Sequence, residues 1–101
     1  MGNYQEIADI LEKHALFLEG KPGGVRAGFK LKNLTKIDLS RRDLRQSDFS
    51  GATLFGVKLA ESNLTEASLF GADMRLCNLN LANLTRADLR GACLRGATLT
   101  D

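Results

Sequence analysis

The stretch ANLTRADLRG at residues 82–91 decides the fold, because it contains two near-identical five-residue units in tandem. The same period extends from about residue 27 to the last residue. Leu, Met or Phe recurs at every fifth position in fourteen consecutive units: Leu34, Leu39, Leu44, Phe49, Leu54, Leu59, Leu64, Leu69, Met74, Leu79, Leu84, Leu89, Leu94 and Leu99. Phe29 lies in the same phase. Neither an α-helix nor a flat strand has a period of five, so each unit must turn a corner.

The residues around each central apolar position indicate which way the neighbouring side chains point. Two positions before the centre, residues from Ser47 onward are small or modest in size, so large and small inward side chains can interdigitate without voids. The position immediately before the centre is mostly Asp, Asn, Ser or Thr, whose side chains stabilise turns by bonding the backbone. Gly51, Gly71 and Gly91 lie twenty residues apart, which predicts four units per coil.

These units resemble the pentapeptide-repeat pattern A-[DN]-L-x-x, and the resemblance covers roughly residues 27–101. It implies an all-β solenoid, a right-handed quadrilateral parallel β-helix of about three and a half coils that stack through backbone hydrogen bonds. Residues 27–101 are therefore expected to form one pentapeptide-repeat β-helix. The segment before them is similar to the leader segments that precede such repeats in bacterial proteins.

Residues 1–26 are predicted to form an N-terminal capping helix followed by a Gly/Pro loop. An apolar face at helical spacing runs over residues 3–19 and consists of Tyr4, Ile7, Ile10, Leu11, His14 and Leu18. Gly20 and Pro22 end the pattern. We expect this helix to cover the open core of the first coil, and the alternative is a detachable helix that binds a partner.

Two charged residues interrupt the inward column of the first coil. Lys32 and Arg42 stand where later units carry small residues, and an unpaired charge is costly to bury. We expect a distorted or partly open first coil, to which the capping helix lends carboxylates. At the other end, Asp101 completes its unit without a visible cap. Two expectations follow: either the chain is cut from a longer protein, or the open end stacks on a second copy as a homodimer.

Composition narrows the functional classes. The 101 residues carry a net charge of +2 with acidic and basic residues interleaved, which is typical of a solvated surface. No secretory signal or membrane-length apolar run is present, and two cysteines do not make a disulfide framework, so we expect a cytoplasmic protein.

Residues that could carry catalysis are few. The single histidine lies on the apolar face of the predicted helix, and Cys77 is expected to point inward and Cys93 outward. The loop GKPGG at 20–24 lacks the spacing of a phosphate-binding loop. We therefore predict that the protein is not an enzyme and holds no cofactor and no metal.

The predicted surface offers better candidates for binding. Phe55, Phe70, Leu76 and Leu81 occupy outward positions and are candidates for a partner-contact surface, although isolated exposed apolar residues are also ordinary. A second set, the possible basic contact for phosphate or an acidic protein, consists of Arg75, Arg90 and Arg95. The alternative for these arginines is a merely solvated face.

The function predicted from these features is a non-catalytic scaffold that binds an unidentified protein partner, without a membrane. The family resemblance supplies the alternative, a DNA mimic that inhibits a type II topoisomerase and confers quinolone resistance. The net charge of +2, the short chain and the missing dimerisation helix disfavour it. Direct binding of nucleic acid is a third hypothesis, and its candidates also include Lys30, Lys32, Lys36 and Arg41.

Overall fold

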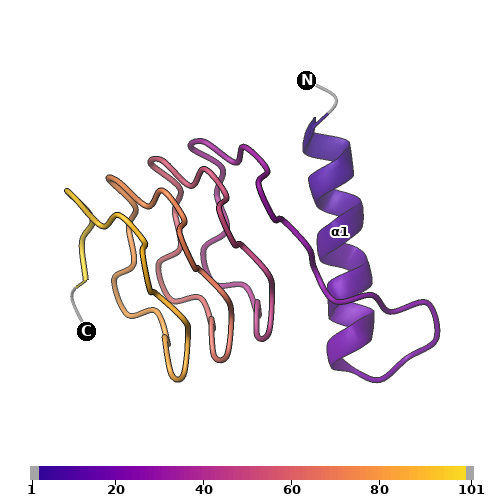
Figure 1. The fold of residues 1–101 in the computed structure, drawn as a ribbon. Helices are drawn as coiled ribbons and strands as arrows, with labels where there is room; N and C mark the ends of the chain where they lie inside the picture. The colour runs from indigo at the N-terminus through magenta and orange to yellow at the C-terminus, as the bar shows by residue number, and fades with distance from the viewer. Residues whose placement is uncertain (1–2, 100–101) are drawn as a thin grey trace.

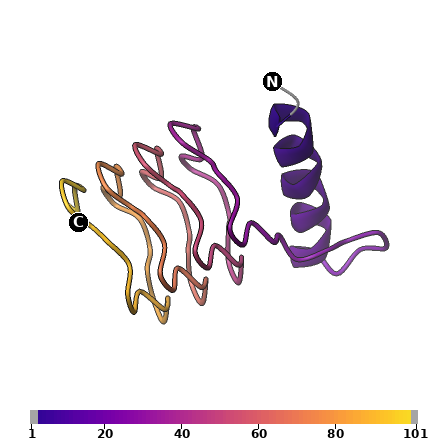
Figure 2. The same cartoon turned by 45° about the horizontal axis from the view of Figure 1, so that its top comes forward.

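The computed structural model describes residues 3–99, in which one helix, α1 (Asn3–Leu18), precedes a stack of coils. In Figures 1 and 2 the helix lies across one end of the stack, and the chain then winds away from it toward the C-terminus. The coils pair through isolated parallel bridges rather than long strands, because a corner every five residues leaves one bridged residue per side. Asp101, which was predicted to complete the last unit without a cap, lies outside the described residues.

The bridges confirm the predicted twenty-residue register. They run from Gly28 paired with Asp48 to Asn78 paired with Thr98, and every pair is twenty residues apart. Backbone hydrogen bonds join neighbouring coils throughout. The N–H of Leu54, for example, donates to the carbonyl of Asp73 at 2.7 Å, and the Asp73 N–H returns a bond to the Ala52 carbonyl at 2.9 Å. Each coil therefore provides hydrogen-bond partners for the backbone N–H and C=O groups of the next, as a β-helix requires.

Every corner uses the same backbone conformation. The N–H of Val57 donates to the carbonyl of the central Leu54 at 3.1 Å, and the residue before it, Gly56, has a φ of 67°. A positive φ at this position is the mark of a type II turn. The same left-handed position recurs at fourteen corners: Leu31, Lys36, Arg41, Gln46, Gly51, Gly56, Glu61, Glu66, Gly71, Leu76, Leu81, Arg86, Gly91 and Gly96.

Short polar side chains stabilise these corners as expected. The Oδ1 atom of Asn63 accepts the N–H of Thr65 at 3.0 Å, two residues further on. Asn33, Asp48 and Asn83 accept the equivalent bonds at 2.9 to 3.0 Å. Where Asp or Asn precedes the centre, its side chain therefore holds the turn that follows.

The central apolar residues form a continuous core along the coil axis. Those from Phe29 to Met74 are fully buried, and the rings of Phe29 and Phe49 stack with centroids 5.0 Å apart. Cys77 is buried and Cys93 is exposed, as predicted. Leu84, Leu89 and Leu94 are only partly buried, and Leu99 is 53% exposed, because within residues 3–99 no further coil covers them.

Helix α1 docks on the first coil through one face. Ile7 and His14 are buried, and the His14 Nδ1 atom accepts the N–H of Ala27 at 2.9 Å. The His14 Nε2 atom lies 3.4 Å from the Ser47 hydroxyl oxygen. The placement of Tyr4 on this buried face is wrong: it is 69% exposed, one turn before Ile7, which leaves its hydroxyl in water.

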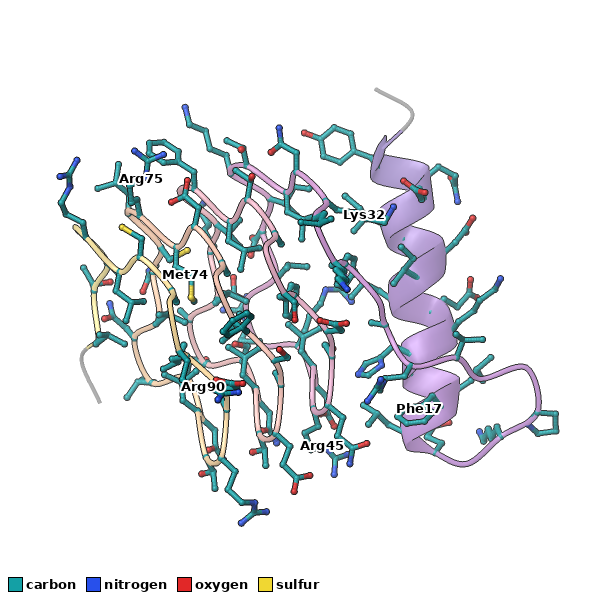
Figure 3. All side chains as sticks on the ribbon, in the orientation of Figure 1. Phe17, Lys32, Arg45, Met74, Arg75 and Arg90 are labelled. Carbon is teal, nitrogen blue, oxygen red and sulfur yellow. The ribbon has the colours of Figure 1, made fainter. Side chains whose placement is uncertain are left out.

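The first coil is less distorted than its charged inward residues suggested. Its bridges keep the twenty-residue register, and the distortion is confined to one turn, where the Arg42 N–H does not bond the Leu39 carbonyl. As expected, α1 lends a carboxylate: the Lys32 ammonium lies beside the helix, 3.3 Å from Glu6 Oε2 (Figure 3). Arg42 is exposed instead of buried, which avoids the cost of desolvating its charge.

Candidate interaction surface

Residues twenty apart stack, so each corner of the rod is a column of outward side chains. One column, here the Phe55 corner, contains residues 35–36, 55–56, 75–76 and 95–96. The preceding column along the chain, the Phe70 corner, contains residues 30–31, 50–51, 70–71 and 90–91. The two corners border the same side of the rod. Six of the seven predicted contact residues lie on these two corners, namely Phe55, Phe70, Arg75, Leu76, Arg90 and Arg95.

At the Phe55 corner, an arginine lies over an aromatic ring of the previous coil. The Arg75 guanidinium is 5.2 Å from the ring centroid of the half-buried Phe55, a cation–π distance. Its Nε and Nη2 atoms each donate to the Asp73 carboxylate at 2.8 Å. These bonds hold the pKa of Asp73 below its usual value. Arg75 is therefore fixed between a ring and a carboxylate.

The Phe70 corner repeats this arrangement. The Arg90 guanidinium is 5.6 Å from the ring centroid of Phe70, which is 52% exposed. Arg90 donates to both carboxylate oxygens of Asp88, at 2.9 and 2.8 Å. These bonds lower the pKa of Asp88 to about 2. Figure 3 shows Arg75 and Arg90 on the outside of the coils.

The three predicted basic residues therefore differ in how freely they could bind an anion. Arg75 and Arg90 are each neutralised by an aspartate two residues earlier. Arg95 shares the Phe55 corner and forms no ion pair with any residue in 3–99. Lys30 and Lys36 are exposed on the same two corners and also form no ion pair among residues 3–99. These corners therefore combine apolar and aromatic side chains with three cations that no carboxylate neutralises.

Exposed leucines lie over glycines of the next coil. A Cβ atom at Gly96 would be 2.6 Å from Leu76 Cδ2, and one at Gly51 would be 2.7 Å from Leu31 Cδ2. Both leucines remain more than half exposed. Leu31 was not among the residues predicted from the sequence, although Gly51 twenty residues later was a usable signal. Leu31, Phe70 and the adjacent glycines line an apolar hollow of about 210 Å³.

Leu81 lies apart from this group. It is 56% exposed at the corner that follows the Phe55 corner along the chain, so Phe70 and Leu81 flank that corner on opposite sides. The structure thus places Phe55 and Leu76 on one column and Phe70 on its neighbour. We call Leu31, Phe55, Phe70 and Leu76, with Arg75 and Arg90, the aromatic–arginine surface.

The groups with reactive chemistry are placed differently. Burial lowers the pKa of His14 and raises that of Cys77 to about 11, and the Cys77 thiol donates to the Leu54 carbonyl at 2.8 Å. Both side chains therefore serve the packing. Residues 3–99 contain no cluster of three His, Cys, Asp or Glu that could hold a metal ion. In the same range, no helix has the length and hydropathy needed to cross a membrane.

Comparison with known proteins agrees with the coiled architecture. The family model described as pentapeptide repeats matches residues 33–69 and 62–101. A pentapeptide repeat protein from the Arabidopsis thaliana thylakoid lumen is 38% identical, with a TM-score of 0.72 over 73% of this chain and 51% of that one. Rfr23, a pentapeptide repeat protein from the cyanobacterium Cyanothece, is 28% identical, with a TM-score of 0.71 over 76% and 52% of the two chains.

A third solved structure carries a functional description. QnrB1, a plasmid-mediated fluoroquinolone resistance protein, is 28% identical, with a TM-score of 0.61 over 77% of this chain and 37% of that one. The chain spans about half the length of the first two structures and less of the third. No protein of curated function matches its sequence.

Proposed function

Because the chain belongs to the pentapeptide-repeat family, we propose that it is a non-catalytic scaffold that binds another protein through its aromatic–arginine surface. We take the rod to be a right-handed quadrilateral β-helix in the cytoplasm, as the family resemblance and the composition imply. One observation supports the binding site most: two Phe–Arg pairs repeat the same geometry on neighbouring corners.

The physical properties of these corners suit protein recognition. Aromatic residues and arginine are enriched where protein interfaces concentrate their binding energy. Each arginine is already held by a ring and a carboxylate, so binding would freeze little additional side-chain motion. The backbone beneath them is joined to the next coil at every unit, which keeps the side chains at a constant spacing.

The test compares a double variant with a matched control. Phe55→Ala with Phe70→Ala removes both rings, whereas Leu81→Ala removes an apolar side chain about as exposed as Phe70 from the other flank. We expect a partner captured from extract of the source cell to be lost by the double variant and retained by Leu81→Ala. Circular dichroism should show that both variants keep the wild-type fold. The proposal is refuted if no captured protein depends on the two rings.

A second candidate function rests on the similarity to QnrB1, a fluoroquinolone resistance protein. As a DNA mimic, the chain would occupy the DNA-binding surface of a type II topoisomerase. The net charge of +2 opposes this function, because a DNA mimic must present negative charge to a cationic surface. A gyrase supercoiling assay discriminates the two: strong inhibition at micromolar protein would favour the mimic over the scaffold.

A further inference from the structure

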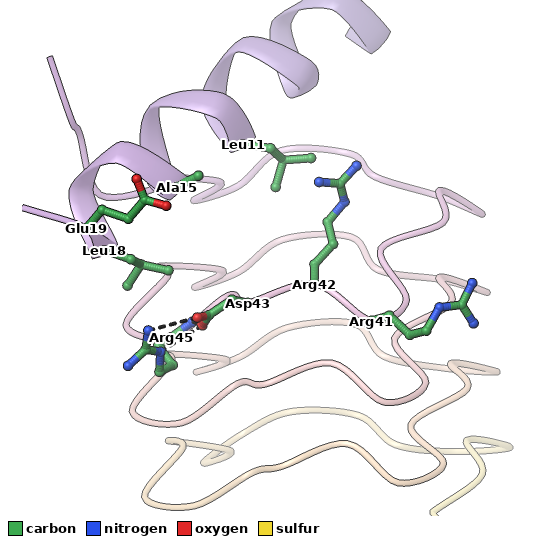
Figure 4. Close-up of a pocket in the computed structure, with 8 residues that line it drawn as sticks. All are labelled: Leu11, Ala15, Leu18, Glu19, Arg41, Arg42, Asp43 and Arg45. Atoms are coloured by element: carbon green, nitrogen blue, oxygen red, sulfur yellow. Dashed lines mark hydrogen bonds and ion pairs between the residues drawn. The ribbon is translucent and has the colours of Figure 1, made fainter. Parts of the chain in front are cut away.

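A cleft of about 520 Å³ separates the C-terminal half of α1 from one corner of the first coil. Figure 4 shows its two unlike walls. The helix wall presents Leu11, Ala15 and Leu18, which lie on one face because they are four and three residues apart. The coil wall presents Arg41, Arg42 and Arg45. An apolar wall therefore faces a cationic one.

The carboxylates in this cleft are already paired. Asp43 accepts two bonds at 2.8 Å from the Arg45 guanidinium, so Arg45 is neutralised where it stands. Glu19 lies 3.0 Å from the Lys21 ammonium. Neither acid is bonded to Arg41 or Arg42. These two guanidinium groups have no ion-pair or hydrogen-bonded side-chain partner among residues 3–99.

Arg42 is the more unusual of the two, because it stands at an inward position of the repeat. The equivalent residues of the next two coils are Ser62, which is buried, and Ala82. With that column filled, the Arg42 side chain extends out of the coil end toward α1 (Figure 4). Lys32, the other charged inward residue, is neutralised by Glu6 of the helix. The helix supplies Arg42 with no such carboxylate.

We propose that this cleft binds a peptide segment of a partner protein in which an apolar side chain lies beside an Asp or Glu. The apolar side chain packs against Leu11 and Leu18, and the carboxylate accepts hydrogen bonds from the guanidinium of Arg42 in the forked geometry that arginine offers carboxylates. A small-molecule site buries most of its ligand. This cleft is open to solvent between helix and coil, which suits a chain segment that enters and leaves.

Fluorescence anisotropy with labelled six-residue peptides tests this proposal. The probe peptide alternates Leu and Glu, and two reference peptides replace either every Leu by Ser or every Glu by Gln. The proteins are the wild type, Arg42→Ala, Arg42→Lys and the matched control Arg95→Ala, which removes an unpaired charge from the last coil. Arg42 is exposed, so its removal leaves the buried contacts of α1 in place, and circular dichroism checks this.

We expect Arg42→Ala to weaken binding of the Leu–Glu peptide at least about tenfold, because hydrogen bonds to charged groups stabilise more than those between neutral groups. Arg42→Lys, which keeps the charge but loses the fork, should fall between the wild type and Arg42→Ala. Arg95→Ala and the Phe55→Ala, Phe70→Ala double variant should bind like the wild type, which separates this site from the aromatic–arginine surface. The proposal is overturned if the wild type and Arg42→Ala bind the Leu–Glu peptide equally, or if Arg95→Ala loses as much affinity as Arg42→Ala. It is also overturned if the wild type binds either reference peptide as tightly as the Leu–Glu peptide, or does not bind the Leu–Glu peptide at millimolar concentration.

Discussion

The same substitution at two glycines should change stability in opposite directions. Gly71 has a φ of 67°, whereas Gly28 lies outside the left-handed region, and a Cβ atom at either position would meet nothing within 4 Å. Alanine at either site reduces the entropy of the unfolded chain, which stabilises by ~0.4–1 kcal/mol. Only at Gly71 does the alanine also adopt a left-handed backbone, at a cost of ~1–2 kcal/mol. Gly28→Ala should thus raise the free energy of unfolding, and Gly71→Ala should lower it by about 0.5–1 kcal/mol.

Because the unfolded-state contribution cancels between the two variants, their difference isolates the cost of the left-handed corner, about 1–2 kcal/mol. Urea unfolding followed by circular dichroism measures it. With an m-value of ~1.5 kcal/mol per molar, the midpoint of Gly28→Ala should exceed that of Gly71→Ala by roughly 1 M. Gly96→Ala should lie lower still, because its Cβ would also displace Leu76. Coincident midpoints for Gly28→Ala and Gly71→Ala would show that the corners do not use this backbone conformation.

Three further predictions test the core, the helix contact and the surface ion pairs. Leu64→Ala removes a fully buried side chain and should lower the free energy of unfolding by about 3–5 kcal/mol in urea; a loss below about 1 kcal/mol would contradict a packed axis. Because burial lowers the pKa of His14, the stability it contributes is complete above its ordinary value of about 6.5 and declines as the pH falls below it. Amide protection factors of α1 should therefore be smaller at pH 5 than at pH 7.5, and equal values would argue against this contact. Arg90→Gln removes the donor that holds the pKa of Asp88 near 2, so an NMR titration should find that pKa raised, and an unchanged value would show that the pair does not form in solution.

Much of the fold could be predicted because the repeat is local. Which side chains point inward follows from position within five residues, so the burial of Leu64 and Cys77 and the exposure of Cys93 were correct. The Asp and Asn residues before the centres were also placed correctly at turns, since their side chains bond a residue only two positions away. The left-handed corner was not predicted, because nine of the fourteen corner residues are not glycine.

The candidate surface was predicted only in part. The outward placement of Phe55, Phe70, Leu76 and Leu81 and their distribution over the columns follow from the five-residue and twenty-residue periods. The ion pairs of Arg75 and Arg90 with aspartates two residues earlier were visible in principle in the sequence. Their position over rings twenty residues away was not, because it depends on side-chain conformation across coils.

By itself, the sequence determined the five-residue corner, the twenty-residue coil and the inward or outward direction of each side chain, since these depend on short-range backbone geometry repeated many times. The tertiary structure alone decided which charge of the first coil the helix neutralises. There, Lys32 meets Glu6 across twenty-six residues, while Arg42 faces a cleft beside α1 without a carboxylate. No repeat encodes those contacts, because they arise where a helix of different period packs against the end of the coil.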